Sequence, residues 1–245
     1  MLVHFDGSTI RSRFVALIAA LCIMVGTPAQ AASNAALIDA FNKTMFASEY
    51  SLFHFGSGYV RKFATPVRLY VGGTVTGERR RQVQEFALSL NDLIDGLRVI
   101  LVNRPSTANF VVHLVRRTQY EQFVREQVVR TANARVRGRC MVQAKYNRSG
   151  IWRSDAVVVA DEGDALFNRC MTEEILQGLG PLNDDPSLHQ SMFNDSTSWT
   201  EFRRFDRLLL NMLYDKRLKP GMSQDEANSL LPAIIRDVRR SIESG

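Results

Sequence analysis

The chain has 245 residues, of which 45% are hydrophobic, and a formal net charge of +6. Its arginines occur in small groups without interleaved aromatic residues, so we expect a solvated basic surface and no nucleic-acid partner, with attraction to anionic envelope polymers left open. No stretch beyond residue 31 is long and apolar enough to cross a membrane, which excludes a membrane-spanning domain there.

Residues 1–31 have the three parts of a secretory signal peptide. Two arginines form the positive n-region, and residues 14–25 form an apolar run that is too short to span a bilayer comfortably. Small residues follow at the −3 and −1 positions of a cleavage site between Ala31 and Ala32. We therefore expect one periplasmic or secreted domain over residues 32–245, and an uncleaved N-terminal anchor is the alternative.

The predicted elements alternate between strand and helix and then become helical only. In chain order we expect a helix over 34–47, a strand over 66–71, a helix over 78–93, strands over 99–102 and 110–115, a helix over 119–130, strands over 140–146 and 156–160, and helices over 164–179, 202–213 and from 223 onward. This order predicts an α/β (α+β) fold, a mixed sheet with helices packed on it and a helical C-terminal half.

Removal of the signal peptide leaves two of the three cysteines, Cys140 and Cys170. An even number of cysteines in an oxidising compartment predicts a disulfide between them. Two buried free thiols are the alternative.

One segment, E-E-x-x-Q-x-x-G-x-x-N-D, carries the residues that could perform chemistry. On a helix Glu173 and Gln177 share a face at spacing i, i+4, and Glu174 lies on the flank of that face. Gly180 can end the helix and turn the chain, so that Asn183 could return toward the helix.

This spacing resembles that of the metzincin zinc peptidases, whose pattern is H-E-x-x-H-x-x-G-x-x-H followed by a Met-turn. In that resemblance Glu173, Gln177 and Asn183 stand at the positions of the three zinc-binding histidines. Glu174 stands at the position of the general base, which makes it the candidate catalytic residue. The preceding elements also resemble the N-terminal half of that zincin-like fold.

Three further residues carry the metzincin resemblance. Gly180 fits the turn glycine, and Asp184 matches the acidic residue that follows the third histidine in many members. Met192, in a Ser-Met-Phe segment, is similar to the methionine of the Met-turn and is expected to be structural.

All three histidines are absent, however. One carboxylate and two amides form a poor zinc site, and such oxygens suit a hard cation such as calcium better. We therefore expect no zinc cofactor, with weak binding of a calcium-like cation as the alternative. Without a metal, Glu174 has nothing to lower the pKa of an attacking water.

Residues 170–225 also resemble a narrower group, a domain family of exported proteins from Gram-negative bacteria whose activity is not established. The resemblance rests on the motif, on the S-M-F-N-D segment that begins at Ser191, and on residues 213–222. It implies family membership and no activity.

Two functions follow from these observations. The first is a monomeric, non-catalytic pseudoenzyme that binds a peptide or an envelope partner through Glu173, Gln177, Asn183 and Asp184. The second is a peptidase-like hydrolase that uses Glu174 without a metal or with an oxygen-ligated cation. A polar helix face with an internal hydrogen-bond network is the purely structural interpretation.

Overall fold

The computed structural model describes residues 32–46, 58–73, 75–131 and 133–244. The predicted signal peptide, together with Ala31 at its cleavage site, lies outside the described residues. The chain from Ala32 to Gly245 forms one compact unit. Within the described ranges no helix is long and apolar enough to cross a membrane.

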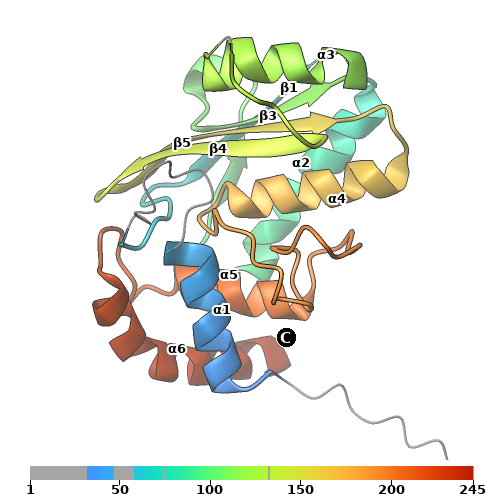
Figure 1. Ribbon diagram of the computed structural model, residues 1–245. Coiled ribbons are helices and arrows are strands. Elements are labelled where there is room, and N and C mark those ends of the chain that lie inside the picture. The colour runs from blue at the N-terminus through green and yellow to red at the C-terminus, as the bar shows by residue number, and fades with distance from the viewer. Residues whose placement is uncertain (1–31, 47–57, 74, 132, 245) are drawn as a thin grey trace, which may run out of the picture. The chain divides into compact units, whose positions relative to one another are not determined.

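A five-stranded sheet forms the centre of this unit, with the strand order β2-β1-β3-β5-β4 (Figure 1). Four strands are parallel, and β4 pairs antiparallel with β5 at one edge of the sheet. The strands are β1 (Val67–Gly73), β2 (Val99–Leu101), β3 (Phe110–Val115), β4 (Cys140–Asn147) and β5 (Gly150–Val159). The predicted mixed α/β architecture is therefore present.

The helices fall before, between and after the strands. They are α1 (Asn34–Phe46), α2 (Gly77–Leu93), the single 3₁₀ turn η1 (Pro105–Thr107), α3 (Arg117–Phe123) with its π-helical continuation η2 (Val124–Val129), α4 (Asp164–Gln177), α5 (Arg204–Tyr214) and α6 (Gln224–Ser244). Only β5 differs greatly from the prediction, since it begins six residues earlier than expected.

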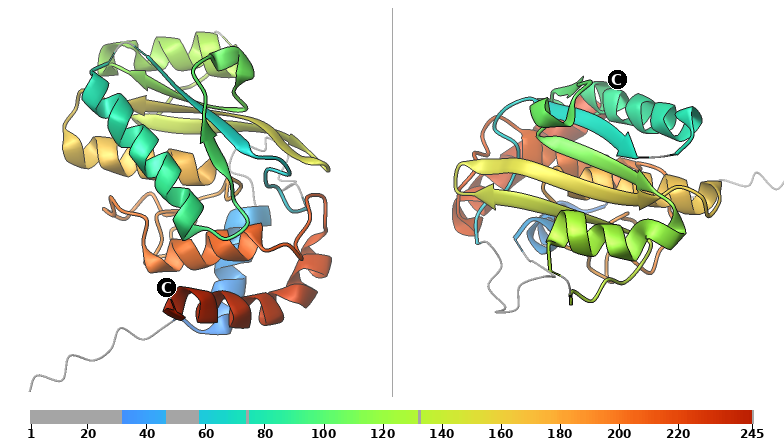
Figure 2. Two further views of the ribbon diagram at one scale, coloured as in Figure 1. Left: turned by 180° about the vertical axis from the view of Figure 1, so that it is seen from behind. Right: turned by 90° about the horizontal axis from the view of Figure 1, so that it is seen from above.

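The helices cover both faces of the sheet (Figures 1 and 2). α3 and η2 cover one face through a small apolar cluster that includes Tyr120, Val124 and Val157. α2 and α4 cover the other face, where the main core continues into α5, α1 and α6. As a result, α4 lies between the sheet and the remaining helices and loops.

Three contacts hold α4 against the sheet. Cys170 of α4 is bonded to Cys140 of β4, with a Cα–Cα distance of 5.7 Å. The Ser154 hydroxyl of β5 donates a 2.7 Å hydrogen bond to the carbonyl of Gly178, just beyond the helix. A Cβ atom on Gly178 would lie 2.4 Å from the ring of Phe110, so only glycine permits this approach to β3. The position of the motif is therefore fixed at the middle of the helix and at its C-terminal end.

Candidate functional site

The motif helix places its polar residues in the interior. Glu173, Glu174 and Gln177 are 3%, 5% and 8% exposed. Burial of a carboxylate is costly unless hydrogen bonds or opposite charges compensate it. The partners of these three side chains therefore decide what the site can do.

Arg169 lies one turn before Glu173 on α4 and carries the nearest positive charge. Its Nη2 is 3.2 Å from Glu173 Oε1 and 3.8 Å from Asp195 Oδ1. Its Nη1 donates to the carbonyl of Thr197. The arginine thus connects the helix to the loop that precedes α5.

The two amides of the motif donate hydrogen bonds within the protein. Gln177 Nε2 donates to Asp184 Oδ1 at 2.8 Å. Asn183 Nδ2 donates to the carbonyls of Lys43 on α1 and of Asp184, both at 3.0 Å. The structure therefore brings Glu173, Gln177 and Asp184 together, whereas the amide nitrogen of Asn183 is directed toward α1.

Four acidic residues gather here, which we call the carboxyl cluster: Glu173, Glu174, Asp184 and Asp195. One carboxylate oxygen from each of Glu173, Asp184 and Asp195 lies within 4.8 Å of the other two. An oxygen of Glu174 lies within 4.8 Å of an oxygen of Glu173 and of the sulfur of Cys140. Asp195 is the member that the sequence analysis missed.

Glu174 is the least compensated member of the cluster. Its Oε2 is buried and has no hydrogen-bond partner among the described residues. Burial raises the pKa of Glu174 well above its ordinary value, and the negative charges of Glu173 and Asp184 raise it further, against the opposing charge of Arg169. The side chain is therefore biased toward its protonated form.

The donor set does not fit a zinc ion. The three motif positions whose spacing resembles that of zinc-binding histidines supply one carboxylate, which pairs with Arg169, and two amides whose nitrogens donate hydrogen bonds to protein oxygens. The sulfur of Cys140 lies within 4.8 Å of Glu173 and Glu174, but it belongs to the disulfide and is not a thiolate. Zinc prefers nitrogen and thiolate ligands, and these described side chains offer it neither.

The segment around Met192 is held by a buried aspartate from α5. Met192 is fully buried, and its backbone N–H donates to Asp206 Oδ2 at 3.1 Å. The Ser191 hydroxyl donates to Asp206 Oδ1 at 2.5 Å. Burial raises the pKa of Asp206 to about 7, although both hydrogen bonds oppose the shift. The sequence analysis did not identify this aspartate.

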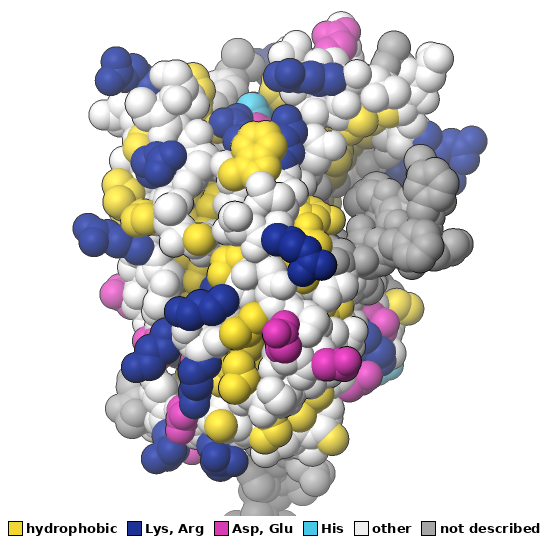
Figure 3. Space-filling model, turned by 90° about the vertical axis from the view of Figure 1, so that its left-hand side faces the viewer, with side chains coloured by type: hydrophobic (Ala, Val, Ile, Leu, Met, Phe, Trp, Pro, Cys, Tyr) yellow, Lys and Arg dark blue, Asp and Glu magenta, His cyan; other side chains and the backbone are white. Residues whose placement is uncertain are grey.

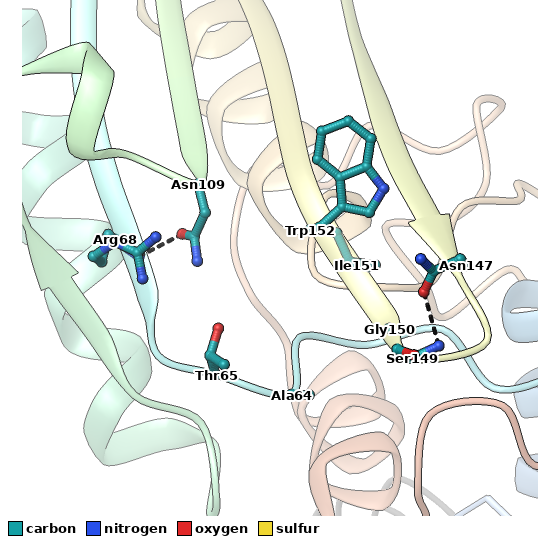
Figure 4. Close-up of a pocket in the computed structure, with 9 residues that line it drawn as sticks. All are labelled: Ala64, Thr65, Arg68, Asn109, Asn147, Ser149, Gly150, Ile151 and Trp152. Atoms are coloured by element: carbon teal, nitrogen blue, oxygen red, sulfur yellow. Dashed lines mark hydrogen bonds between the residues drawn. The ribbon is translucent and has the colours of Figure 1, made fainter.

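The described surface elsewhere includes a shallow cavity of about 300 Å³ beside η2 and another of about 350 Å³. Figure 4 shows Arg68 and Asn109 on one side of the larger cavity, Asn147 and Ser149 on the other, and Trp152 between them. None of its lining residues belongs to the motif. On the face shown in Figure 3, Lys and Arg side chains are spread among neutral and hydrophobic ones, as expected for a solvated basic surface.

A family model described as "Protein of unknown function (DUF2927)" matches residues 34–233. The chain belongs to the DUF2927 family. The match begins with α1 and ends within α6, so the whole carboxyl cluster lies inside the DUF2927 domain. No curated protein matches the chain.

The raised pKa of Asp206 predicts a pH-dependent stability of the DUF2927 domain. The native carboxyl keeps its proton up to about pH 7, whereas the unfolded one loses it near its ordinary pKa of 3.8. The native state thus binds more protons in this window, and its stability should fall as pH rises from about 4 to 7 and stay level above 7.

Urea denaturation of the protein and of Asp206→Asn at several pH values isolates this contribution. The wild-type free energy of unfolding, relative to the variant, should fall by on the order of 4 kcal/mol across the window. Asp92→Asn, which alters an exposed aspartate on α2, is the matched control and should give a flat difference. A flat difference for Asp206→Asn as well would contradict the assignment.

Proposed function

We propose that this DUF2927 domain is an exported, non-catalytic binding domain on a degenerate metzincin-like scaffold. The observation that carries the proposal is the state of the residues at the zinc-ligand positions. Glu173 pairs with Arg169, and the amide nitrogens of Gln177 and Asn183 donate to Asp184 and to α1. Side chains at positions where a zinc peptidase would coordinate its metal ion thus form an ion pair and hydrogen bonds within the protein.

The proposed ligand is an extended peptide that pairs with the outer edge of β4. This strand pairs only with β5 among the described strands, and an unpaired edge can accept another strand through its backbone. The disulfide fixes the start of β4 to α4 beside the carboxyl cluster, so a peptide on this edge would pass close to Glu173 and Glu174.

The hydrogen-bond pattern shows which backbone groups of β4 face outward. The N–H of Val159 donates to the carbonyl of Arg139, which makes these opposed residues a hydrogen-bonded pair. Pairing alternates in an antiparallel ladder, so Val142 and Ala144 belong to non-bonded pairs and direct their backbone groups away from β5. In agreement, Ser154 lies opposite Ala144 but does not donate its N–H to β4. This N–H donates to the carbonyl of Asn109, the residue that precedes β3.

Export is the second part of the proposal. It rests on the three-part signal in residues 1–31 and on the disulfide, a bond typical of oxidising compartments. Expression of the full chain in a Gram-negative host, followed by N-terminal sequencing of the protein in the periplasm, should give a mature chain that begins at Ala32. An uncleaved cytoplasmic chain would contradict export.

The peptide proposal predicts that a proline at residue 144 weakens binding. Ala144→Pro removes an outward N–H and no hydrogen bond to β5, and proline is tolerated at such edge positions. The binding assay begins with an array of random dodecapeptides. The best binder is then measured by fluorescence polarisation, where the dissociation constant should rise about tenfold or more, which corresponds to about 1.4 kcal/mol.

Ala144→Ser keeps the N–H at the same site and serves as the matched control. This variant should bind the peptide within about twofold of the wild type. The reason is that it retains the outward hydrogen bond, which is worth on the order of 1 kcal/mol. Unchanged binding by Ala144→Pro, or an array without any peptide above background, would refute pairing at this edge.

Hydrolysis that uses Glu174 is a second candidate function. The observation in its favour is a buried carboxyl with a raised pKa and an unpartnered oxygen beside a second carboxyl, a setting in which an acid can hold and release a proton. If it is correct, a screen of peptides and glycans yields a turnover that Glu174→Gln abolishes. The exposed-site variant Asp92→Asn should retain that turnover. A screen without turnover would count against hydrolysis.

A further inference from the structure

The excess positive charge of the domain is concentrated in one segment. Residues 116–139, which we call the arginine layer, hold seven arginines, no lysine and two glutamates, and therefore carry a net charge of +5. Residues 32–245 as a whole also carry +5, because residues 1–31 contribute one of the six excess charges. The rest of the domain is therefore neutral, and its entire positive excess lies in the arginine layer.

Four of the seven arginines have no acidic partner in the part of the chain that the structure describes. Arg117 and Arg125 both contact Glu121, and Arg139 contacts Glu162. The guanidinium groups of the other four form no ion pair or hydrogen bond with a described residue. All four are exposed: Arg116, Arg130, Arg135 and Arg137. Several unpaired charges of one sign on one segment attract a partner that carries several negative charges.

The fold holds the arginine layer on the outside of the molecule. α3 and η2 are the outermost elements on their face of the sheet, and no other described element covers them (Figures 1 and 2). The segment that follows η2 is tied to α3, because the carbonyl of Arg137 accepts a 3.4 Å hydrogen bond from the hydroxyl of Tyr120. Val136 packs against the apolar cluster beneath, whereas its neighbours Arg135 and Arg137 are exposed.

Arg130 occupies a backbone position that usually belongs to glycine. It ends η2 with a φ of 54° and a ψ of 40°, in the left-handed region. Among the described residues it is the only one other than glycine with a positive φ. Glycine or asparagine usually takes such a position at the end of a helix, because larger side chains are disfavoured there. The side chain of Arg130 makes no described contact that offsets this cost, which points to a role for its charge outside the fold.

We propose that the arginine layer binds the phosphate headgroups of an anionic membrane surface. A guanidinium donates two parallel hydrogen bonds to one phosphate and is more weakly hydrated than an ammonium group, so arginines without lysines suit this ligand. Basic residues beside a membrane are attracted by its negative surface potential over a short distance only. A domain whose excess charge lies in one outer layer can bring that charge against a flat surface.

Nucleic acid is the other common phosphate polymer, and the arginine layer lacks the aromatic platform that single strands require. Its two aromatic residues are Tyr120, which is fully buried, and Phe123, which is half-buried beside the ring of His113. Proteins that bind single strands stack the bases on accessible aromatic rings. A lipid surface needs no such platform, so the described side chains favour lipid headgroups.

Cosedimentation of the purified protein with lipid vesicles tests the proposal. Vesicles of phosphatidylcholine with about one third phosphatidylglycerol should bind the protein in about 0.1 M NaCl, whereas vesicles of phosphatidylcholine alone should not. An increase to about 0.5 M NaCl should release the protein, because salt screens the attraction between exposed charges.

Two triple variants with the same loss of charge make the test specific. The first combines Arg116→Gln, Arg135→Gln and Arg137→Gln. Its partition coefficient should fall about 100-fold, because each basic residue near an anionic membrane contributes roughly a factor of five. The control replaces three exposed arginines outside the arginine layer by glutamine: Arg98, Arg104 and Arg236. It should bind within about threefold of the wild type, because charges beyond the contact are screened.

Both triple variants should keep the wild-type Tm, because none of the six side chains forms an ion pair with a described residue. No binding to the anionic vesicles, or an equal loss of binding in the two triple variants, would overturn the proposal. Tighter binding to DNA than to the anionic vesicles, lost only in the first variant, would assign the arginine layer to nucleic acid instead. Ala144→Pro should bind the vesicles as the wild type does, so peptide pairing at β4 can fail independently of this outcome.

Discussion

The burial of α4 is the constraint on which the rest of the structure depends. The helix lies between the sheet and the helices α1, α5 and α6, with Cys170 bonded to β4 and Gly178 packed on Phe110. A helix fixed in this way forces Glu173 and Glu174 into the interior, where their charges must be compensated. Arg169 meets part of this requirement through its ion pair with Glu173. The motif amides and the surrounding loops supply further polar contacts.

Much of the fold could be predicted because periodicity reports local structure directly. The strand over Phe110–Val115 and the helix from Asp164 onward have the predicted starts. The first half of β5 could not be predicted, because the polar residues Arg153, Ser154 and Asp155 give no strand pattern there. Pairing with β4 and β3 overrides their local preference. Long-range pairing of this kind leaves no local signal.

The residues of the candidate site, too, could be predicted only where the sequence carries a local signal. Arg169 could have been found from its i, i+4 spacing to Glu173, which is a local helical signal. Asp195 could not, since it lies in a loop without periodicity and only the folded chain brings it to Glu173. Asp206 could not either, since it lies on α5 and its contact with Met192 joins residues that are distant in the sequence. Asn183 shows the opposite case, because its amide nitrogen turns to α1 although its spacing allowed a return to the motif helix. The observed motif helix therefore carries buried carboxyl and amide groups whose partners come both from the helix itself and from distant loops.

The metal content of the purified protein tests this central claim most directly. The protein should be prepared without a metal-binding tag and measured by elemental analysis after dialysis. We predict zinc far below one atom per chain, because Glu173 is ion-paired and the amides of Gln177 and Asn183 donate hydrogen bonds within the protein. Stoichiometric zinc that survives dialysis would contradict it.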